Sequence, residues 1–116
     1  MGKEKEFEMY ELKFWFEHGG TCLWSKNEAA RETYGYAIDL AALPISETLA
    51  KKLAQLEEEY HGFLDWSDPR KTQWDSAQKL DFLYRANAAY QEIQIELRQT
   101  HRIENHAEAS LYFDVN

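Results

Sequence analysis

The amino-acid sequence predicts a small α+β domain, and three patterns of apolar residues lead to this expectation. Within residues 12–16, strongly apolar side chains recur at every second position, as in a strand with one buried face. Residues 49–60 place apolar side chains at spacings of four, three and four, which form one stripe on a helix. Residues 77–97 carry a broader helical apolar face. A chain of 116 residues fits a single domain spanning residues 1–116.

An N-terminal hairpin is expected first. Its leading strand covers residues 7–17, where Leu12, Phe14 and Phe16 share one parity. The Gly-Gly pair at positions 19 and 20 supplies a turn, because glycine tolerates positive φ. Residues 21–25 then return as a second, antiparallel strand.

Two helices with clear end signals are expected next. Asn27 can accept hydrogen bonds from the first turn of a short helix that Gly35 ends. Ser46 caps the second helix, and the apolar stripe of that helix consists of Leu49, Leu53, Leu56 and Tyr60. Residues 36–43 are expected to be extended or irregular, and residues 67–72 a polar loop.

The longest helix is expected near residues 75–100, fading between positions 100 and 105. Asp75 and Gln78 are spaced as a capping box at its start. Its apolar residues are numerous enough to predict cover on more than one side, and comprise Leu80, Phe82, Leu83, Tyr84, Ala86, Ala89, Tyr90, Ile93, Ile95 and Leu97.

A final strand is expected at the C-terminus. Leu111, Phe113 and Val115 alternate with Tyr112 and Asp114. The N-terminal strand is its expected partner. The predicted architecture is therefore a small antiparallel sheet, formed by the N-terminal hairpin and the C-terminal strand, packed against about three helices.

Charge and cysteine content restrict the function classes. The formal net charge of −8 argues against direct binding of nucleic acid, which needs a basic footprint. Residues 46–68 hold two lysines and six carboxylates, a net charge of −4. One cysteine cannot form an internal disulfide, and no leader or long apolar run is evident. We therefore expect a cytoplasmic protein that does not enter a membrane.

Candidate chemical groups are few, and each has a simpler structural interpretation. Cys22 and His18 could form a thiolate–imidazole pair, but no third orienting group is evident, so a buried thiol is favoured. His101 and His106 with two nearby glutamates match no zinc spacing, so a surface cluster is favoured. We expect no catalytic residues, no metal ligands and no cofactor.

An acidic and aromatic surface is the best candidate binding site. Trp66 and Trp74 flank a loop beside the acidic helix, and tryptophans next to carboxylates are typical of interface hot spots. A solvated face, with the tryptophans capping the sheet, is the simpler alternative. The predicted partner-binding residues are Glu57, Glu58, Glu59, Tyr60, Asp65, Trp66 and Asp68.

The segment from residue 20 to residue 66 also resembles a family pattern. Its successive units are Cys22-Leu23-Trp24, Tyr34-Gly35-Tyr36, Ile38-Asp39-Leu40, Leu43-Pro44-Ile45-Ser46 and Leu64-Asp65-Trp66. The pattern is similar to that of small bacterial proteins of the immunity class, which accompany polymorphic or contact-dependent toxins. The resemblance implies a protein partner, the cognate toxin domain, and it carries no active site.

The leading hypothesis is a non-catalytic immunity protein that neutralises a toxin, with a nuclease as the expected toxin class. An acidic face would lie against the basic groove of such a nuclease. The alternative is a structural or regulatory homodimer that pairs through the apolar face of residues 77–97. An enzyme with an unrecognised site is the third hypothesis, supported only by scattered histidines and carboxylates.

Overall fold

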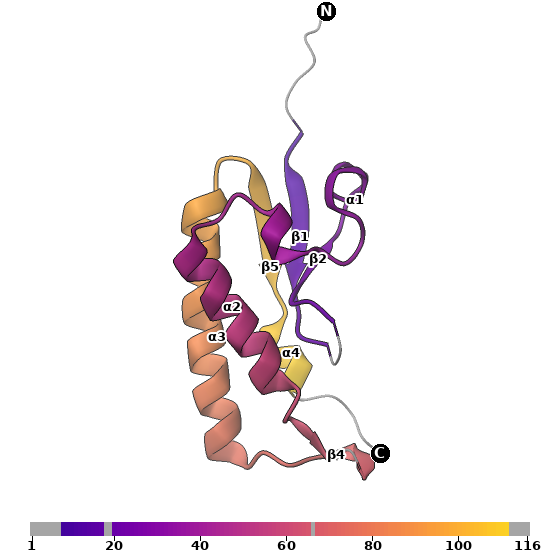
Figure 1. Ribbon diagram of the computed structural model, residues 1–116, viewed down its shortest axis with the longest axis vertical. Coiled ribbons are helices and arrows are strands. Elements are labelled where there is room, and N and C mark those ends of the chain that lie inside the picture. The colour runs from indigo at the N-terminus through magenta and orange to yellow at the C-terminus, as the bar shows by residue number, and fades with distance from the viewer. Residues whose placement is uncertain (1–7, 18–19, 66, 112–116) are drawn as a thin grey trace, which may run out of the picture.

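The computed structural model describes residues 8–17, 20–65 and 67–111, and of residues 64, 65 and 69–71 it describes only the backbone. Its main sheet has three strands in the order β2-β1-β5. They are β1 (Tyr10–Phe14), β2 (Leu23–Ser25) and β5 (His101–Asn105). The central strand β1 is antiparallel to β2 and parallel to β5, so the sheet is mixed and not antiparallel throughout as predicted. Figure 1 shows α2 and α3 side by side along one side of this sheet.

The predicted α+β class is confirmed, and so is the N-terminal hairpin. Leu12, Phe14 and Phe16 are buried, while Lys13 and Trp15 between them are half-buried. This alternation is the period of two that places successive side chains on opposite faces of a strand. The observed strand is shorter than the predicted span of residues 7–17, and residue 7 lies outside the described residues.

The predicted helix ends are confirmed by their hydrogen bonds. The Asn27 side chain accepts from the amide of Ala30 at the start of α1 (Glu28–Tyr34). Gly35 ends that helix with φ of 82°, a left-handed conformation that glycine adopts without strain. Ser46 caps α2 (Glu47–Tyr60). Asp75 and Gln78 form the reciprocal capping box of α3 (Ser76–Leu97).

The N-terminal strand pairs with a different segment from the one expected. The third strand of the sheet is β5 at residues 101–105, and Leu111 lies in the short helix α4 (Ala107–Leu111). Residues 112–116 of the predicted strand lie outside the described residues. The sequence did not predict β5, because this strand contains a single strongly apolar residue, Ile103, and its alternation was too weak to detect.

One further prediction for a connecting segment is wrong. Of the residues expected to form a polar loop, Asp68–Thr72 form the strand β4, which pairs with β3 (Leu64–Asp65) in an irregular register. A proline and several charges in β4 disguise it, since such residues are depleted in strands. The segment 36–43 is largely extended or irregular, as expected, and within it residues Leu40–Ala42 form the short 3₁₀ turn η1, which the Asp39 side chain caps.

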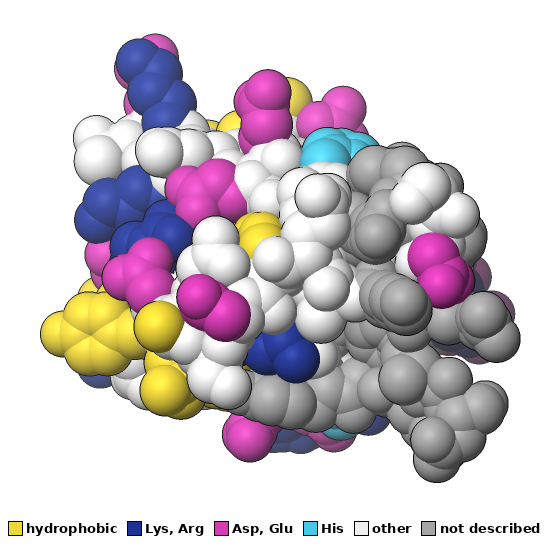
Figure 2. Space-filling model, turned by 90° about the horizontal axis from the view of Figure 1, so that it is seen from below, with side chains coloured by type: hydrophobic (Ala, Val, Ile, Leu, Met, Phe, Trp, Pro, Cys, Tyr) yellow, Lys and Arg dark blue, Asp and Glu magenta, His cyan; other side chains and the backbone are white. Residues whose placement is uncertain are grey.

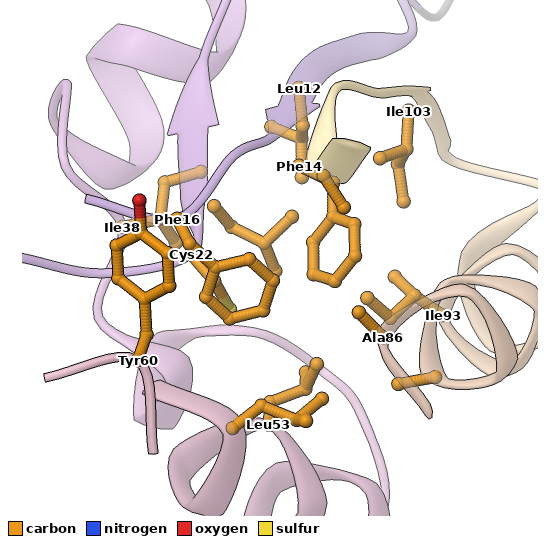
Figure 3. Packing of buried hydrophobic residues seen from close by; sticks show 14 of the residues in the cluster. Leu12, Phe14, Phe16, Cys22, Ile38, Leu53, Tyr60, Ala86, Ile93 and Ile103 are labelled. Carbon is orange, nitrogen blue, oxygen red and sulfur yellow. The ribbon is translucent and has the colours of Figure 1, made fainter. Parts of the chain in front are cut away.

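One hydrophobic core holds these elements together. It lies between the inward face of the sheet and the helices α2 and α3, and Figure 3 shows Phe14 and Phe16 directed toward Leu53 and Ala86. The predicted stripe of α2 is confirmed, because Leu49, Leu53, Leu56 and Tyr60 are all buried. Aromatic rings contribute much of this packing, since each buries a large apolar area.

Ser110 connects three elements through buried hydrogen bonds. Its hydroxyl accepts from the amide of Phe16 at 2.9 Å, just beyond β1. Its carbonyl accepts from the Tyr60 hydroxyl at 2.6 Å, which ties α4 to the end of α2. A carbonyl near the end of a short helix has no partner within the helix, so Tyr60 supplies one.

The Tyr60 hydroxyl should therefore contribute measurably to stability. Tyr60→Phe leaves the Ser110 carbonyl without its donor, and we expect the free energy of unfolding to fall by about 1–2 kcal/mol in urea titration. Tyr36→Phe is the matched control, because the Tyr36 side chain is exposed, and it should change stability by less than about 0.5 kcal/mol. Equal effects of the two variants would contradict the assignment.

Candidate functional site

The three consecutive glutamates of α2 point in three directions. Successive residues of an α-helix are rotated by roughly 100°, so residues 57, 58 and 59 cannot share one face. One carboxylate oxygen of Glu57 accepts from the Cys22 amide at 2.8 Å and from the Thr21 hydroxyl at 3.2 Å. Glu57 thereby holds the segment that leads into β2. Glu58 is exposed on the side of α2 away from the core.

Glu59 faces α3 and forms an ion pair there. Both of its carboxylate oxygens accept from the Arg85 guanidinium, at 2.8 and 2.9 Å. Asp81 accepts from the same guanidinium, so two carboxylates share one cation. The hydrogen bonds that Arg85 donates to Glu59, ahead of those that it donates to Asp81, raise the pKa of Arg85. The pair is half-exposed, so water screens it, and it serves mainly to fix the orientation of the side chains.

The other predicted partner-binding residues lie at the end of α2 and in the β3–β4 hairpin. Tyr60 is 4% exposed, and burial raises the pKa of its hydroxyl to about 12. A partner therefore has little access to Tyr60 in the folded chain. The backbone of Asp65 lies in β3, and Asp68 is half-buried in β4. Trp66 lies outside the described residues. Of the seven predicted residues, Glu58 has the most accessible described side chain.

Cys22 lacks the environment of a nucleophile. Its side chain is fully buried, and burial, followed by the charge of Glu57, raises the pKa of the thiol well above its usual value. A reactive cysteine needs a lowered pKa, since the thiolate is the reacting species. His18, its proposed partner, lies outside the described residues.

The two C-terminal histidines have separate structural roles in β5 and its exit. The ring of His101 is buried, with Nε2 2.8 Å from the Tyr34 hydroxyl and Nδ1 2.6 Å from the Thr100 hydroxyl. His106 instead pairs with Glu104, which also binds Lys26. Lys26 and then His106 lower the pKa of Glu104 to about 2. Within the described residues, no three His, Cys, Asp or Glu side chains are placed to hold a metal ion.

A groove between α2 and α3 is the surface feature that the sequence did not reveal. It has a volume of about 270 Å³, and its apolar lining comes from Leu56, Tyr84, Ala88 and Ala89. The hollow exists because Ala88 and Ala89 have small side chains that do not fill the space between the two helices. Figure 2, viewed toward the end of the molecule where α2 ends and α3 begins, shows apolar side chains projecting beside clustered charges.

The prediction that α3 is covered on more than one side is wrong for three of its residues. Leu80, Tyr84 and Ile95 are exposed, although they were counted with the inward apolar face. The buried residues of α3 are Phe82, Ala86, Ala89, Ile93 and Leu97, which lie on the opposite side of the helix. The available signal was an excess of apolar residues over what one helix face can bury. Among the described residues, no helix combines the length and apolarity needed to cross a bilayer.

His101 should make stability depend on pH. Burial lowers its pKa in the folded chain below that in the unfolded chain, which is about 6.5. Below that pH the unfolded chain binds a proton that the folded chain resists, so acidification favours unfolding. We expect the stability measured in urea to fall as the pH drops from 7 through 6 toward the folded pKa, and His101→Gln to flatten that part of the curve. An identical slope for both proteins would argue against this role.

The sequence of the chain is similar to that of a known protein family. Residues 10–108 match the model of a protein family described as Serratia CdiI immunity protein-like. The matched segment begins at the first residue of β1 and ends within α4, so it includes the whole sheet and the three longest helices. No curated protein matches the chain. Because the match covers most of the sequence, the chain belongs to the Serratia CdiI immunity protein-like family.

Proposed function

We propose that this chain binds a bacterial toxin domain and neutralises it without catalysing a reaction. Family membership over residues 10–108 is the observation that carries the proposal, because immunity proteins act by binding a toxin and are generally not enzymes. The buried thiol and the separately engaged histidines agree with a binding role. The binding takes place in the cytoplasm of the cell that the protein protects.

A nuclease is the toxin class that fits the charge of the chain best. The active-site groove of a nuclease must be basic to hold a phosphate backbone, and a net charge of −8 complements such a groove. Charge complementarity would raise the association rate, and buried aromatic contacts would slow dissociation. The proposed contact set keeps the seven residues named from the sequence: Glu57, Glu58, Glu59, Tyr60, Asp65, Trp66 and Asp68.

These residues are not equally suited to a test. Glu57 holds the Cys22 amide, Glu59 pairs with Arg85, and Tyr60 is buried, so replacing any of them also perturbs the fold. Glu58 is exposed, so a substitution at this position should change toxin binding with the least effect on folding.

A second candidate function, a structural or regulatory homodimer, is favoured by one observation. Leu80, Tyr84 and Ile95 expose apolar surface on α3, which a second copy could cover. Light scattering across a concentration series distinguishes this candidate, since a dimer would double the molar mass while a monomeric inhibitor would keep it constant.

Glu58→Lys should weaken binding to the toxin domain whose growth inhibition the wild-type chain relieves on co-expression. Reversing one exposed charge should slow association by about three- to tenfold and reduce its dependence on salt. Stopped-flow association at several salt concentrations measures both quantities.

The matched control is Glu32→Lys, which makes the same charge change at an exposed position of α1. A general effect of net charge would slow both variants equally and would count against a contact at Glu58. If the wild-type chain relieves no toxin, the proposed function itself fails.

A further inference from the structure

The short helix α1 is docked on the sheet with little apolar burial. It contacts β1 and β2 and lies apart from α2 and α3 (Figure 1). Of its seven residues, only Ala30 is buried. A helix this short does not persist in water by itself, so contacts with the rest of the fold must hold it. Its two ends are fixed separately, since Asn27 binds the backbone beside β1 and the Ser25 hydroxyl donates to the Gly35 carbonyl at 2.6 Å.

Tyr34, in the last turn of α1, connects this helix to His101 of β5. The Tyr34 hydroxyl lies 2.8 Å from Nε2 of His101. Tyr10 of β1 packs against both residues, with its ring centroid 5.4 Å from that of Tyr34 and 4.9 Å from that of His101. Only 5% of His101 is exposed. The three rings therefore join α1 to both β1 and β5, and the docked position of α1 helps to keep water away from the His101 ring.

Both nitrogens of the His101 ring have neutral partners. Nδ1 lies 2.6 Å from the Thr100 hydroxyl, and Nε2 faces the Tyr34 hydroxyl. A neutral imidazole has one donor and one acceptor nitrogen, so either tautomer matches two hydroxyls. A protonated imidazole carries a positive charge, which a hydroxyl compensates less well than a carboxylate does. These contacts therefore favour the neutral ring.

Within the described part of the chain, His101 has no ion-pair partner. The titratable groups that face its ring are Tyr34 of α1 and Tyr10 of β1, and the turn after α3 contributes an uncharged threonine hydroxyl. Glu11 and Arg102 follow Tyr10 and His101 in their strands, so they point to the opposite face of the sheet, where they pair at 3.6 Å. Burial accordingly lowers the pKa of His101.

We propose that protonation of His101 releases α1 from the sheet, so that mild acid opens this part of the chain while the core between the sheet and the long helices stays folded. The inference goes beyond the proposed function and does not depend on it. In the open state the Tyr34 side chain has left and water reaches the ring, so the imidazolium is hydrated instead of buried.

Thermodynamic linkage determines the direction of this change. A proton binds His101 more tightly in the open state than in the closed state, so acidification must shift the population toward the open state. Unfolding of the whole chain exposes His101 as well, but it also disrupts the hydrophobic core. The opening of α1 leaves that core in place, so it requires less free energy and is populated first.

Backbone hydrogen exchange of the purified chain between pH 7.5 and pH 5.5 tests the opening. Each exchange rate is divided by that of an unstructured peptide at the same pH, which removes the intrinsic effect of pH. The amides of Arg31 and Gly35 report on α1, because they donate within this helix. We expect their protection to be lower than that of α3 amides and to fall below about pH 6.5, by up to about tenfold per pH unit for one proton. Low urea concentrations should leave it unchanged, since a local opening exposes little surface.

Two histidine variants assign the effect to one ring. His101→Gln keeps a polar side chain beside Tyr34 but cannot titrate, so the protection of α1 should no longer depend on pH. His106→Gln is the matched control, because His106 is half-exposed and pairs with Glu104, and it should leave the pH dependence as in the wild type.

Three results would overturn the proposal. In the wild-type chain, equal protection of α1 and α3 amides would mean that only unfolding of the whole chain responds to acid. Protection of α1 that does not change with pH would mean that protonation of His101 does not open the helix. A pH dependence that persists in His101→Gln, or disappears in His106→Gln, would assign the effect to another group. The first two results need no variant, so the test does not rely on the folding of His101→Gln.

Discussion

Burial of one face of β1 against the two long helices is the constraint on which the rest of the structure depends. Leu12 and Phe14 on this face, and Phe16 just beyond the strand, project into the core between the sheet and the helices α2 and α3. Because β1 is the central strand, it also positions both of its neighbours, β2 on one side and β5 on the other. Apolar area removed from water at this one layer therefore stabilises the sheet and the helices together.

The polar contacts at the edges of this core attach the shorter segments to it. Asn27 caps α1 and also donates to the carbonyl of Met9, next to β1. Glu57 holds the start of β2, and Ser110 joins α4 to Phe16 and Tyr60. Each of these bonds satisfies a backbone group that would otherwise lack a partner near the core, which makes it costly to remove. Glu57 and His101, whose residue types are common in catalytic sites, thus have structural roles here.

The packing that forms the core also determines which surface is left for a partner. α3 turns its larger residues Phe82, Ile93 and Leu97 inward and presents alanines toward α2, which produces the groove. The remaining apolar residues of α3 then face outward, beside a rim of ion pairs.

The sequence by itself determined the α+β class, the helix caps and the inward faces of β1 and α2, because each depends on residues within a few positions of one another. A cap needs only Asn27 and Ala30, and a stripe needs only the spacing from Leu49 to Tyr60. Only the tertiary structure decided that β5, with Ile103 as its one strongly apolar residue, is the third strand, since its partner β1 lies far away in the sequence. The tertiary structure likewise decided that Glu57, Glu58 and Glu59 separate and that Tyr84 is exposed. Those outcomes depend on which neighbour each helix face meets, and local spacing contains no information about that neighbour.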